Sequence, residues 1–271
     1  MIREQRFQVI SLRFSPGAGF LALVLAAWSP AVRSQPSIHG GESSPSGPES
    51  GSFEIAQHGH TVGTASFQFT ATKGGYDSTS LVNVAMQGLD YALSKTEQLS
   101  SANQLEHVQL SAIVNGEAVN VVAAPDAAQL LLNISASGKS STTRLEAHSG
   151  AVFLADFDPG ALETLLALAV EQNNRGLWAI LPKNAGSIEP VQLATYADQQ
   201  GTLDGKPITV HHLVATIAGA NTDLFSGPEN QLLQAELPQE GFALVRKGFV
   251  LTPPAKPVAP MDGLAPPAPG I

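Results

Sequence analysis

The chain has 271 residues, a formal net charge of −9 and 14% charged residues, against roughly 25% in an average soluble domain. It contains no cysteine, which excludes disulfide bonds, thiolate metal sites and a thiol nucleophile. The acidic balance argues against a general nucleic-acid binder, because such proteins use Lys and Arg to displace counterions from phosphates.

The first 34 residues predict a secretory signal peptide. Arg3, Arg6 and Arg13 form a positive N-terminal region, and an apolar run follows over 18–28. Cleavage is expected after Ser34, with Ser29-Pro30-Ala31 as a second candidate. The apolar run is shorter than the roughly 20 residues that a membrane-spanning helix needs. We therefore expect export by the general secretion route to the periplasm or beyond, with no transmembrane span after cleavage. An uncleaved membrane anchor is the alternative.

Two further segments lack the pattern of a folded core. Residues 35–52 are dense in Gly, Ser and Pro and predict a flexible linker. Residues 253–271 form a Pro-rich tail that favours extended polyproline II structure and cannot build a core. The sequence thus predicts one folded domain over 53–252.

Within that domain the main signal is alternation of apolar and polar residues, which is typical of half-buried strands. Phe67 and Phe69 share one face of a strand expected over 65–72, and the pattern recurs over 108–114, 130–136 and 191–195. Hairpin turns are expected at dipeptides that accept positive φ at low cost; these are Asn115-Gly116, Ser137-Gly138 and Asp204-Gly205.

One segment has helical rather than strand periodicity. Asp158 is a suitable N-cap and Pro159 suits the first helical position, whereas Asn173, Asn174 and Gly176 are expected to end the helix. Its apolar stripe requires burial, for which the concave face of a curved sheet is the expected place; a helix covering one sheet edge is the alternative. Later strands are expected over 177–182, 187–198, 207–218, 222–226, 231–237 and 242–251.

Several landmarks follow one another in a familiar order. They are Phe53-Glu54-Ile55, the Gly59 and Gly63 turn, the strand 65–72, Asn115-Gly116, the run 152–157 before the helix, 203–207 and the closing strand 241–246. This order resembles uncharacterised exported bacterial domains whose fold is similar to the LolA/LolB-type lipoprotein carriers. The resemblance implies a strongly curved, incomplete antiparallel barrel that is stoppered by helices and holds acyl chains.

The expected fold is therefore mainly β: a strongly curved antiparallel sheet, an incomplete barrel, with one amphipathic helix on its concave face. Apolar side chains of the helix and of the strand 65–72 are the candidate lining of a lipophilic cavity, and the same side chains also suit an ordinary core. These candidates are Leu162, Leu165, Leu166, Val170, Phe67 and Phe69.

Polar side chains give no convergent catalytic pattern. His58 and His60 lie in a Gly-containing turn without an evident third metal ligand, and His211 and His212 point to opposite faces of one strand. Asp156 and Asp158 flank the start of the helix, where capping accounts for both. No Gly-x-Ser-x-Gly motif occurs. We predict no catalytic residue, no metal site and no cofactor.

The leading functional hypothesis is an exported, non-enzymatic protein that binds a lipid-like or other hydrophobic molecule between sheet and helix. The second is a solid-core scaffold of the cell envelope that engages a protein partner through its Pro-rich tail. The third, a hydrolase or metal-dependent enzyme, lacks a supporting constellation of residues.

Overall fold

A computed structural model describes residues 50–183 and 185–253. The predicted signal peptide 1–34, most of the predicted linker and the tail from residue 254 onward lie outside the described residues. The first strand begins at Ser50, so the last three residues assigned to the linker belong to the sheet.

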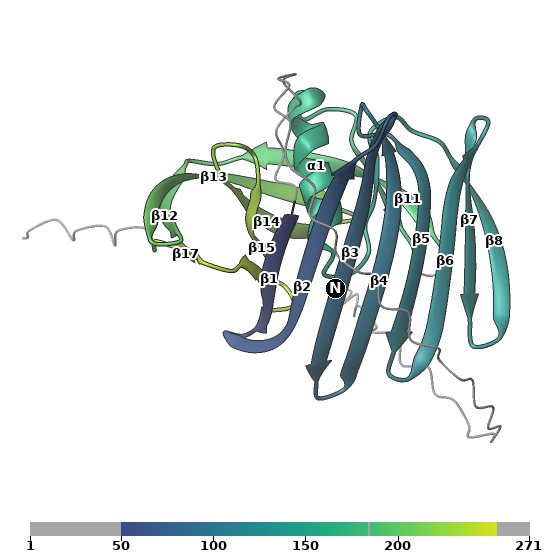
Figure 1. Cartoon of the computed structure of the whole chain (residues 1–271), viewed down its shortest axis with the longest axis horizontal. Coiled ribbons are helices and arrows are strands. Elements are labelled where there is room, and N and C mark those ends of the chain that lie inside the picture. The colour runs from purple at the N-terminus through teal and green to yellow at the C-terminus, as the bar shows by residue number, and fades with distance from the viewer. Residues whose placement is uncertain (1–49, 184, 254–271) are drawn as a thin grey trace, which may run out of the picture. The chain divides into compact units, whose positions relative to one another are not determined.

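The first half of the domain is a continuous meander of long antiparallel strands (Figure 1). Each strand pairs with the next through a tight turn, and inward-facing side chains alternate with outward-facing ones, as the period of two requires. The strands are β1 (Ser50–Gln57), β2 (His60–Ala71), β3 (Gly75–Met86), β4 (Leu89–Ser100), β5 (Leu105–Val114), β6 (Glu117–Asp126), β7 (Gln129–Ala136) and β8 (Lys139–Glu146).

The second half contains the helix and the shorter strands. Helix α1 (Pro159–Glu171) connects β9 (Ala151–Phe153) to β10 (Trp178–Leu181), and these two strands pair in parallel. The remaining strands are β11 (Ser187–Thr195), β12 (Gln199–Leu203), β13 (Lys206–Ile217), β14 (Ala220–Ser226), β15 (Leu232–Leu237), β16 (Phe242–Arg246) and β17 (Phe249–Leu251).

Strand β1 joins the two halves into one curved sheet, because it pairs with β2 on one side and with β16 on the other. From β16 the sheet continues through β15, β14, β13 and β11 to β10 and β9. Strands β8 and β9 do not pair, so the barrel is unclosed. The sheet is mixed rather than wholly antiparallel, because the helical crossover between β9 and β10 makes that one pair parallel.

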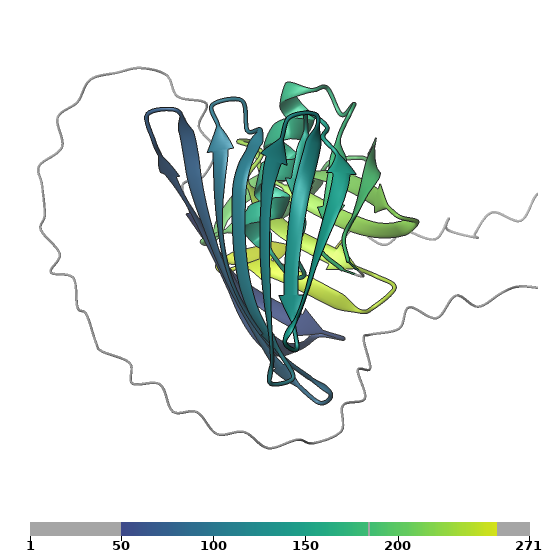
Figure 2. The same ribbon diagram turned by 90° about the vertical axis from the view of Figure 1, so that its right-hand side faces the viewer.

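Helix α1 lies inside this curve and contacts β2, β3, β9 and β15; Figure 2 shows it between the long meander and the shorter strands. The Asp158 carboxylate accepts hydrogen bonds from the backbone N–H groups of Gly160 and Ala161, and Pro159 opens the helix. Both features agree with the sequence prediction. Asn173 and Asn174 adopt positive φ just after the helix, as expected for its end.

The turns that the sequence predicted are present. Asn115, Ser137 and Asp204 have φ values of 52°, 50° and 51° respectively, and each is followed by a glycine that also has positive φ. Such turns twist in the same sense as the flanking strands and so favour antiparallel pairing.

Two predicted strands are divided in the structure. The strand expected over 187–198 ends at Thr195, and β12 (Gln199–Leu203) follows as a separate strand that pairs with β13 and β17. The strand expected over 242–251 is interrupted after Arg246 by a turn in which Gly248 has positive φ. These breaks allow the chain to form a small satellite core around Phe249 beside the main core.

Gly75 is needed for close approach of β3 to β4. A Cβ atom at this position would overlap the backbone of β4 at Leu99 and would lie 2.6 Å from the Ser100 carbonyl carbon. We expect Gly75→Ala to lower the free energy of unfolding by about 1–3 kcal/mol, as overpacking typically does. The neighbouring Gly74→Ala is the matched control, because a Cβ there meets nothing within 4 Å. Equal denaturant midpoints for the two variants would contradict this expectation.

Candidate functional site

The inward face of β4 carries two charged residues in the middle of an otherwise apolar row. Lys95 and Glu97 have 0% and 1% exposure, and they alternate in phase with the buried side chains of Tyr91, Leu93 and Leu99. Charged side chains are almost never fully buried unless they are paired. Each of these two buried side chains therefore needs an oppositely charged group beside it.

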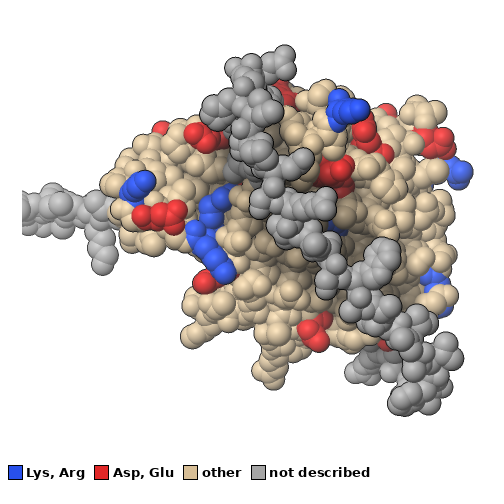
Figure 3. Space-filling view, in the orientation of Figure 1, with Lys and Arg blue, Asp and Glu red and all other residues tan. Residues whose placement is uncertain are grey.

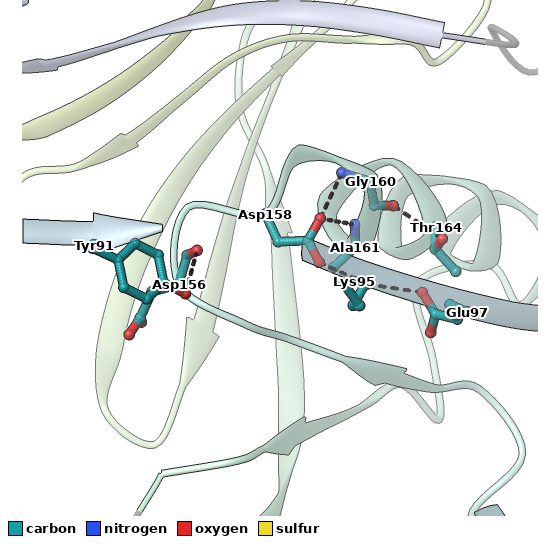
Figure 4. Close-up of polar contacts among 8 residues, drawn as sticks. All are labelled: Tyr91, Lys95, Glu97, Asp156, Asp158, Gly160, Ala161 and Thr164. Atoms are coloured by element: carbon teal, nitrogen blue, oxygen red, sulfur yellow. Dashed lines mark hydrogen bonds and ion pairs between the residues drawn. The ribbon is translucent and has the colours of Figure 1, made fainter. Parts of the chain in front are cut away.

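Lys95 is paired with Glu97 and with Asp158, the N-cap residue of α1. Lys95 Nζ lies 2.9 Å from Glu97 Oε2 and 2.6 Å from Asp158 Oδ2, and the side chains of all three residues have 0% exposure. The other oxygen of Asp158, Oδ1, accepts the hydrogen bonds from Gly160 N at 3.0 Å and Ala161 N at 3.2 Å. Figure 4 shows this arrangement. We call Lys95, Glu97 and Asp158 the buried ion cluster.

Two serines of β3 extend the polar region. Ser78 pairs in register with Glu97, and Ser80 pairs with Lys95. Both side chains are buried, and the two hydroxyl groups, together with Glu97 Oε1, have no hydrogen-bond partner among the described residues. Gly160 lies directly against Ser80, since a Cβ on Gly160 would be 2.5 Å from the Ser80 Oγ. The cluster thus sits where the first turn of α1 meets β3 and β4.

Burial and charge compete within the cluster. Burial alone would lower the pKa of the Lys95 amine, but the adjacent Asp158 and Glu97 carboxylates outweigh it and raise that pKa. Burial raises the pKa of Glu97, and the attraction of Lys95 only partly offsets this effect. Glu97 therefore binds a proton more readily than an ordinary glutamate. Two carboxylates thus share one amine.

Tyr91 lies at the edge of the cluster. Its hydroxyl group donates a hydrogen bond of 3.5 Å to the backbone carbonyl of Asp156. Burial, reinforced by the carboxylates of Asp156 and Asp158, raises the pKa of Tyr91, so its hydroxyl group stays protonated.

A second buried carboxylate fastens the middle of the helix to the opposite side of the barrel. Glu163 Oε2 accepts a 2.8 Å hydrogen bond from the backbone N–H of Leu232 in β15, and Arg246 Nε donates one of 2.7 Å to the carbonyl of the same residue. Burial raises the pKa of Glu163 to about 7, although the Leu232 N–H and the nearby Arg246 charge act in the other direction. The guanidinium group of Arg246 lies over the rings of Phe53 and Phe67.

The six predicted cavity residues fall into three groups. Leu165, Leu166 and Phe67 are at most 3% exposed and belong to one continuous hydrophobic core. Leu162 and Phe69 are partly buried against that core. Val170 is 55% exposed and does not face the interior. The apolar stripe of α1 therefore meets the sheet directly through its first three turns and leaves it at the last one.

A cavity of about 250 Å³ lies at the start of β1, beside the turns after β12 and β16, and not under the helix. Its lining is mainly polar and includes two cations. The lining residues are Ser50, Gly51, Ser52, Leu203, Asp204, Arg246 and Lys247.

The histidines that the sequence singled out are dispersed. His58 occupies a turn with positive φ, and His60 begins β2. His211 and His212 each contact a different aspartate, Asp198 at 3.0 Å and Asp223 at 2.7 Å. Over the described part of the chain, no three His, Cys, Asp or Glu residues are grouped so that they could hold a metal ion.

The interpretation of Asp156 and Asp158 as two capping residues needs correction. Only Asp158 caps the helix, and it also contacts Lys95. Asp156 instead forms an exposed ion pair with Lys183 at 2.7 Å. Phe157 between them adopts positive φ, and this turns the chain before the helix starts.

Sequence reasoning missed Lys95 and Glu97. The available signal was their position two residues apart, in phase with Tyr91, Leu93 and Leu99, which places both charges on the apolar face of a strand. Nothing in the local sequence connects them to Asp158, which lies far along the chain.

The fold and this site define a mainly β, unclosed barrel with a helix held on buried ionisable groups. Comparison of the chain with protein-family models, with curated proteins and with solved structures found no match. No helix within residues 50–183 and 185–253 combines the length and apolar character needed to cross a membrane.

Proposed function

We propose that this protein is an exported, non-enzymatic scaffold or interaction protein of the cell envelope, built on a solid half-barrel. The observation that carries the proposal is the occupancy of the concave face by α1 itself. Leu165 and Leu168 have 0% exposure, and Leu166 has 3%. A carrier of acyl chains needs a space that those side chains already fill.

The two fastenings of the helix support the same proposal. The Asp158 contact to Lys95 holds the start of α1 on β4, and the Glu163 contact to Leu232 holds its middle on β15. Moving the helix aside would leave several buried polar groups without partners, which costs about 1–3 kcal/mol for each group and more for a charged one. The helix is thus a structural part of the core.

The outer face of the meander suits an interaction role. Two neighbouring rows across β2–β8, and a third across β2–β6, carry no charged residue. The exposed aliphatic side chains of Leu81, Ile113 and Val122 lie on this face. Figure 3 shows that charged atoms are sparse there. A neutral face of Ser, Thr, Asn and Gln offers hydrogen bonds without like-charge repulsion. The Pro-rich tail is a second candidate contact for an envelope partner.

A hydrophobic ligand remains the second candidate function. It is favoured by the position of α1 on the concave face of an unclosed sheet, where an apolar ligand could replace the helix. This role requires displacement of α1 from both buried contacts.

Native mass spectrometry of the protein after mild extraction separates the two functions. For the scaffold we expect the mass of the protein without a small hydrophobic ligand, whereas a bound lipid-like molecule in most of the population would favour the carrier. Deletion of residues 253–271 tests the role of the Pro-rich tail. We expect the truncated protein to lose a co-purifying envelope partner and to keep the thermal stability of the full chain. Retention of the partner by the truncated protein would refute the role of the tail.

A further inference from the structure

The buried ion cluster brings together the groups required for a covalent bond between two side chains. Lys95 Nζ is a nucleophile once it loses a proton, and it lies 2.6 Å from an oxygen of the Asp158 carboxyl group. Reacting groups held at contact distance gain a large advantage over the same groups in solution. Both side chains have 0% exposure, so water is excluded from the contact.

Each remaining part of the cluster matches a role in amide formation. The N–H groups of Gly160 and Ala161 already donate to Asp158 Oδ1, at 3.0 and 3.2 Å. Negative charge develops on this oxygen when an amine attacks Cγ, and two N–H donors at the start of a helix stabilise it. Glu97 Oε2, 2.9 Å from Nζ, is placed to accept the amine proton.

We propose that Lys95 and Asp158 form an intramolecular isopeptide bond, with Glu97 as the general acid–base catalyst. The reaction is a single self-modification, so the protein remains a non-enzyme toward other molecules. This inference is independent of the proposed scaffold function.

The atoms balance without an oxidant, a reductant or a co-reactant. Glu97 removes a proton from the Lys95 ammonium group and passes it to Asp158 Oδ2, so that a neutral amine faces a neutral carboxyl group. Nζ attacks Cγ, the Nζ–Cγ bond forms, and negative charge collects on Oδ1. Glu97 then takes a second proton from Nζ and donates it to Oδ2. The Cγ–Oδ2 bond breaks, Oδ2 leaves as water with two hydrogens from the ammonium group, and the amide nitrogen keeps the third.

The product lowers the number of buried charges in the cluster. A buried amine and a buried carboxylate become one neutral amide, so two of the three buried formal charges disappear. Oδ1 becomes the amide oxygen and keeps its hydrogen bonds to Gly160 and Ala161, so the helix cap survives. The raised pKa of Glu97 is consistent with a group that takes up and releases a proton during the reaction.

The bond can be detected by mass spectrometry of the full, purified chain. We expect a mass lower by about 18 Da than the sequence requires, because one water is lost. Trypsin does not cleave after an acylated lysine, so a denatured digest should contain peptide 74–139, uncut after Lys95, joined to peptide 145–175. A measured mass equal to that calculated from the sequence, together with normal cleavage after Lys95, would overturn the proposal.

The chain supplies its own control in the same digest. Lys183 and Asp156 form an ion pair of nearly the same length, 2.7 Å, but their side chains are 59% and 45% exposed. Trypsin should cleave after Lys183 normally. Loss of cleavage at both lysines would indicate a non-specific modification and would count against the proposal.

Two variants test the assigned roles. Glu97→Gln keeps the shape of the side chain but cannot carry the proton, and we expect bond formation to slow by about 10²- to 10⁴-fold. Asp158→Asn should still form the same amide, with loss of ammonia, about 17 Da, in place of water. Bond formation at the wild-type rate in Glu97→Gln would remove Glu97 from the mechanism, and the wild-type digest decides the existence of the bond even if a variant fails to fold.

Discussion

Replacement of Lys95 by Met is expected to lower the free energy of unfolding by about 3–5 kcal/mol, because it leaves two buried carboxyl groups without their cation. Met has a similar length and fills the space, so the loss does not arise from a cavity. Glu97 and Asp158 are both buried beneath the first turn of α1. Chemical denaturation followed by circular dichroism measures the effect.

Lys183→Met is the matched control for Lys95→Met. It breaks an ion pair of similar length whose side chains are 59% and 45% exposed, so we expect a loss of only about 0–1 kcal/mol. A triple variant, K95M/E97Q/D158N, removes all three charges together and should recover much of the stability that K95M loses. A loss in K95M no larger than that in K183M would show that the cluster is unimportant for stability.

Raising the pH through neutrality is expected to lower the free energy of unfolding, because Glu163 then ionises in its buried position between α1 and β15. Burial raises the pKa of Glu163 from 4.5 to about 7. The folded state therefore holds this proton more tightly than the unfolded state does. The contribution to stability is complete below about pH 4.5 and is lost as the pH rises through about 7. The loss is roughly 1.4 kcal/mol for each pH unit between these two values, or about 3 kcal/mol in total.

Glu163→Gln should abolish this part of the pH dependence. The amide oxygen of Gln can still accept the hydrogen bond from the Leu232 N–H but does not titrate, so the variant should gain stability relative to the wild type between pH 4 and pH 8. Glu171→Gln is the control, because that exposed side chain at the end of α1 only accepts a hydrogen bond from Asn103. Parallel stability curves for the wild type and Glu163→Gln would contradict the expectation.

Both experiments probe how the helix is anchored. One contact fixes the start of α1 to the meander, and the other fixes its middle to the shorter strands. If both are as strong as expected, α1 unfolds with the sheet as one cooperative unit. That behaviour is expected of a solid-core scaffold and is difficult to reconcile with a helix that yields to a ligand.

Local features of the fold were predictable because they depend on neighbouring residues alone. The dipeptide Asn115-Gly116 accepts positive φ, and Asp158 followed by Pro159 suits the start of a helix, whichever way the rest of the chain folds. The division of the strand expected over 187–198 was not predictable in this way. Strand β12 is defined by its pairing with β13 and β17, which depends on residues near both 210 and 250.

In the candidate site, too, local spacing was predictable and burial was not. The stripe of Leu162, Leu165 and Leu166 was identified from helical spacing, but spacing alone does not distinguish a filled core from a hollow one. The structure places Leu165 and Leu166 in a continuous core. The end of the stripe was misleading, because Val170 has the right spacing but is 55% exposed.

The sequence by itself determined a low-charge sheet domain between two Pro-rich ends, its turns, and one capped helix, because periodicity and turn chemistry are local properties. Only the tertiary structure decided that Lys95 and Glu97 of β4 meet Asp158 beneath that helix. The physical reason is that burial, and therefore the cost and reactivity of a charge, depends on which distant segments enclose it. The bond that we propose between Lys95 and Asp158 depends on this burial.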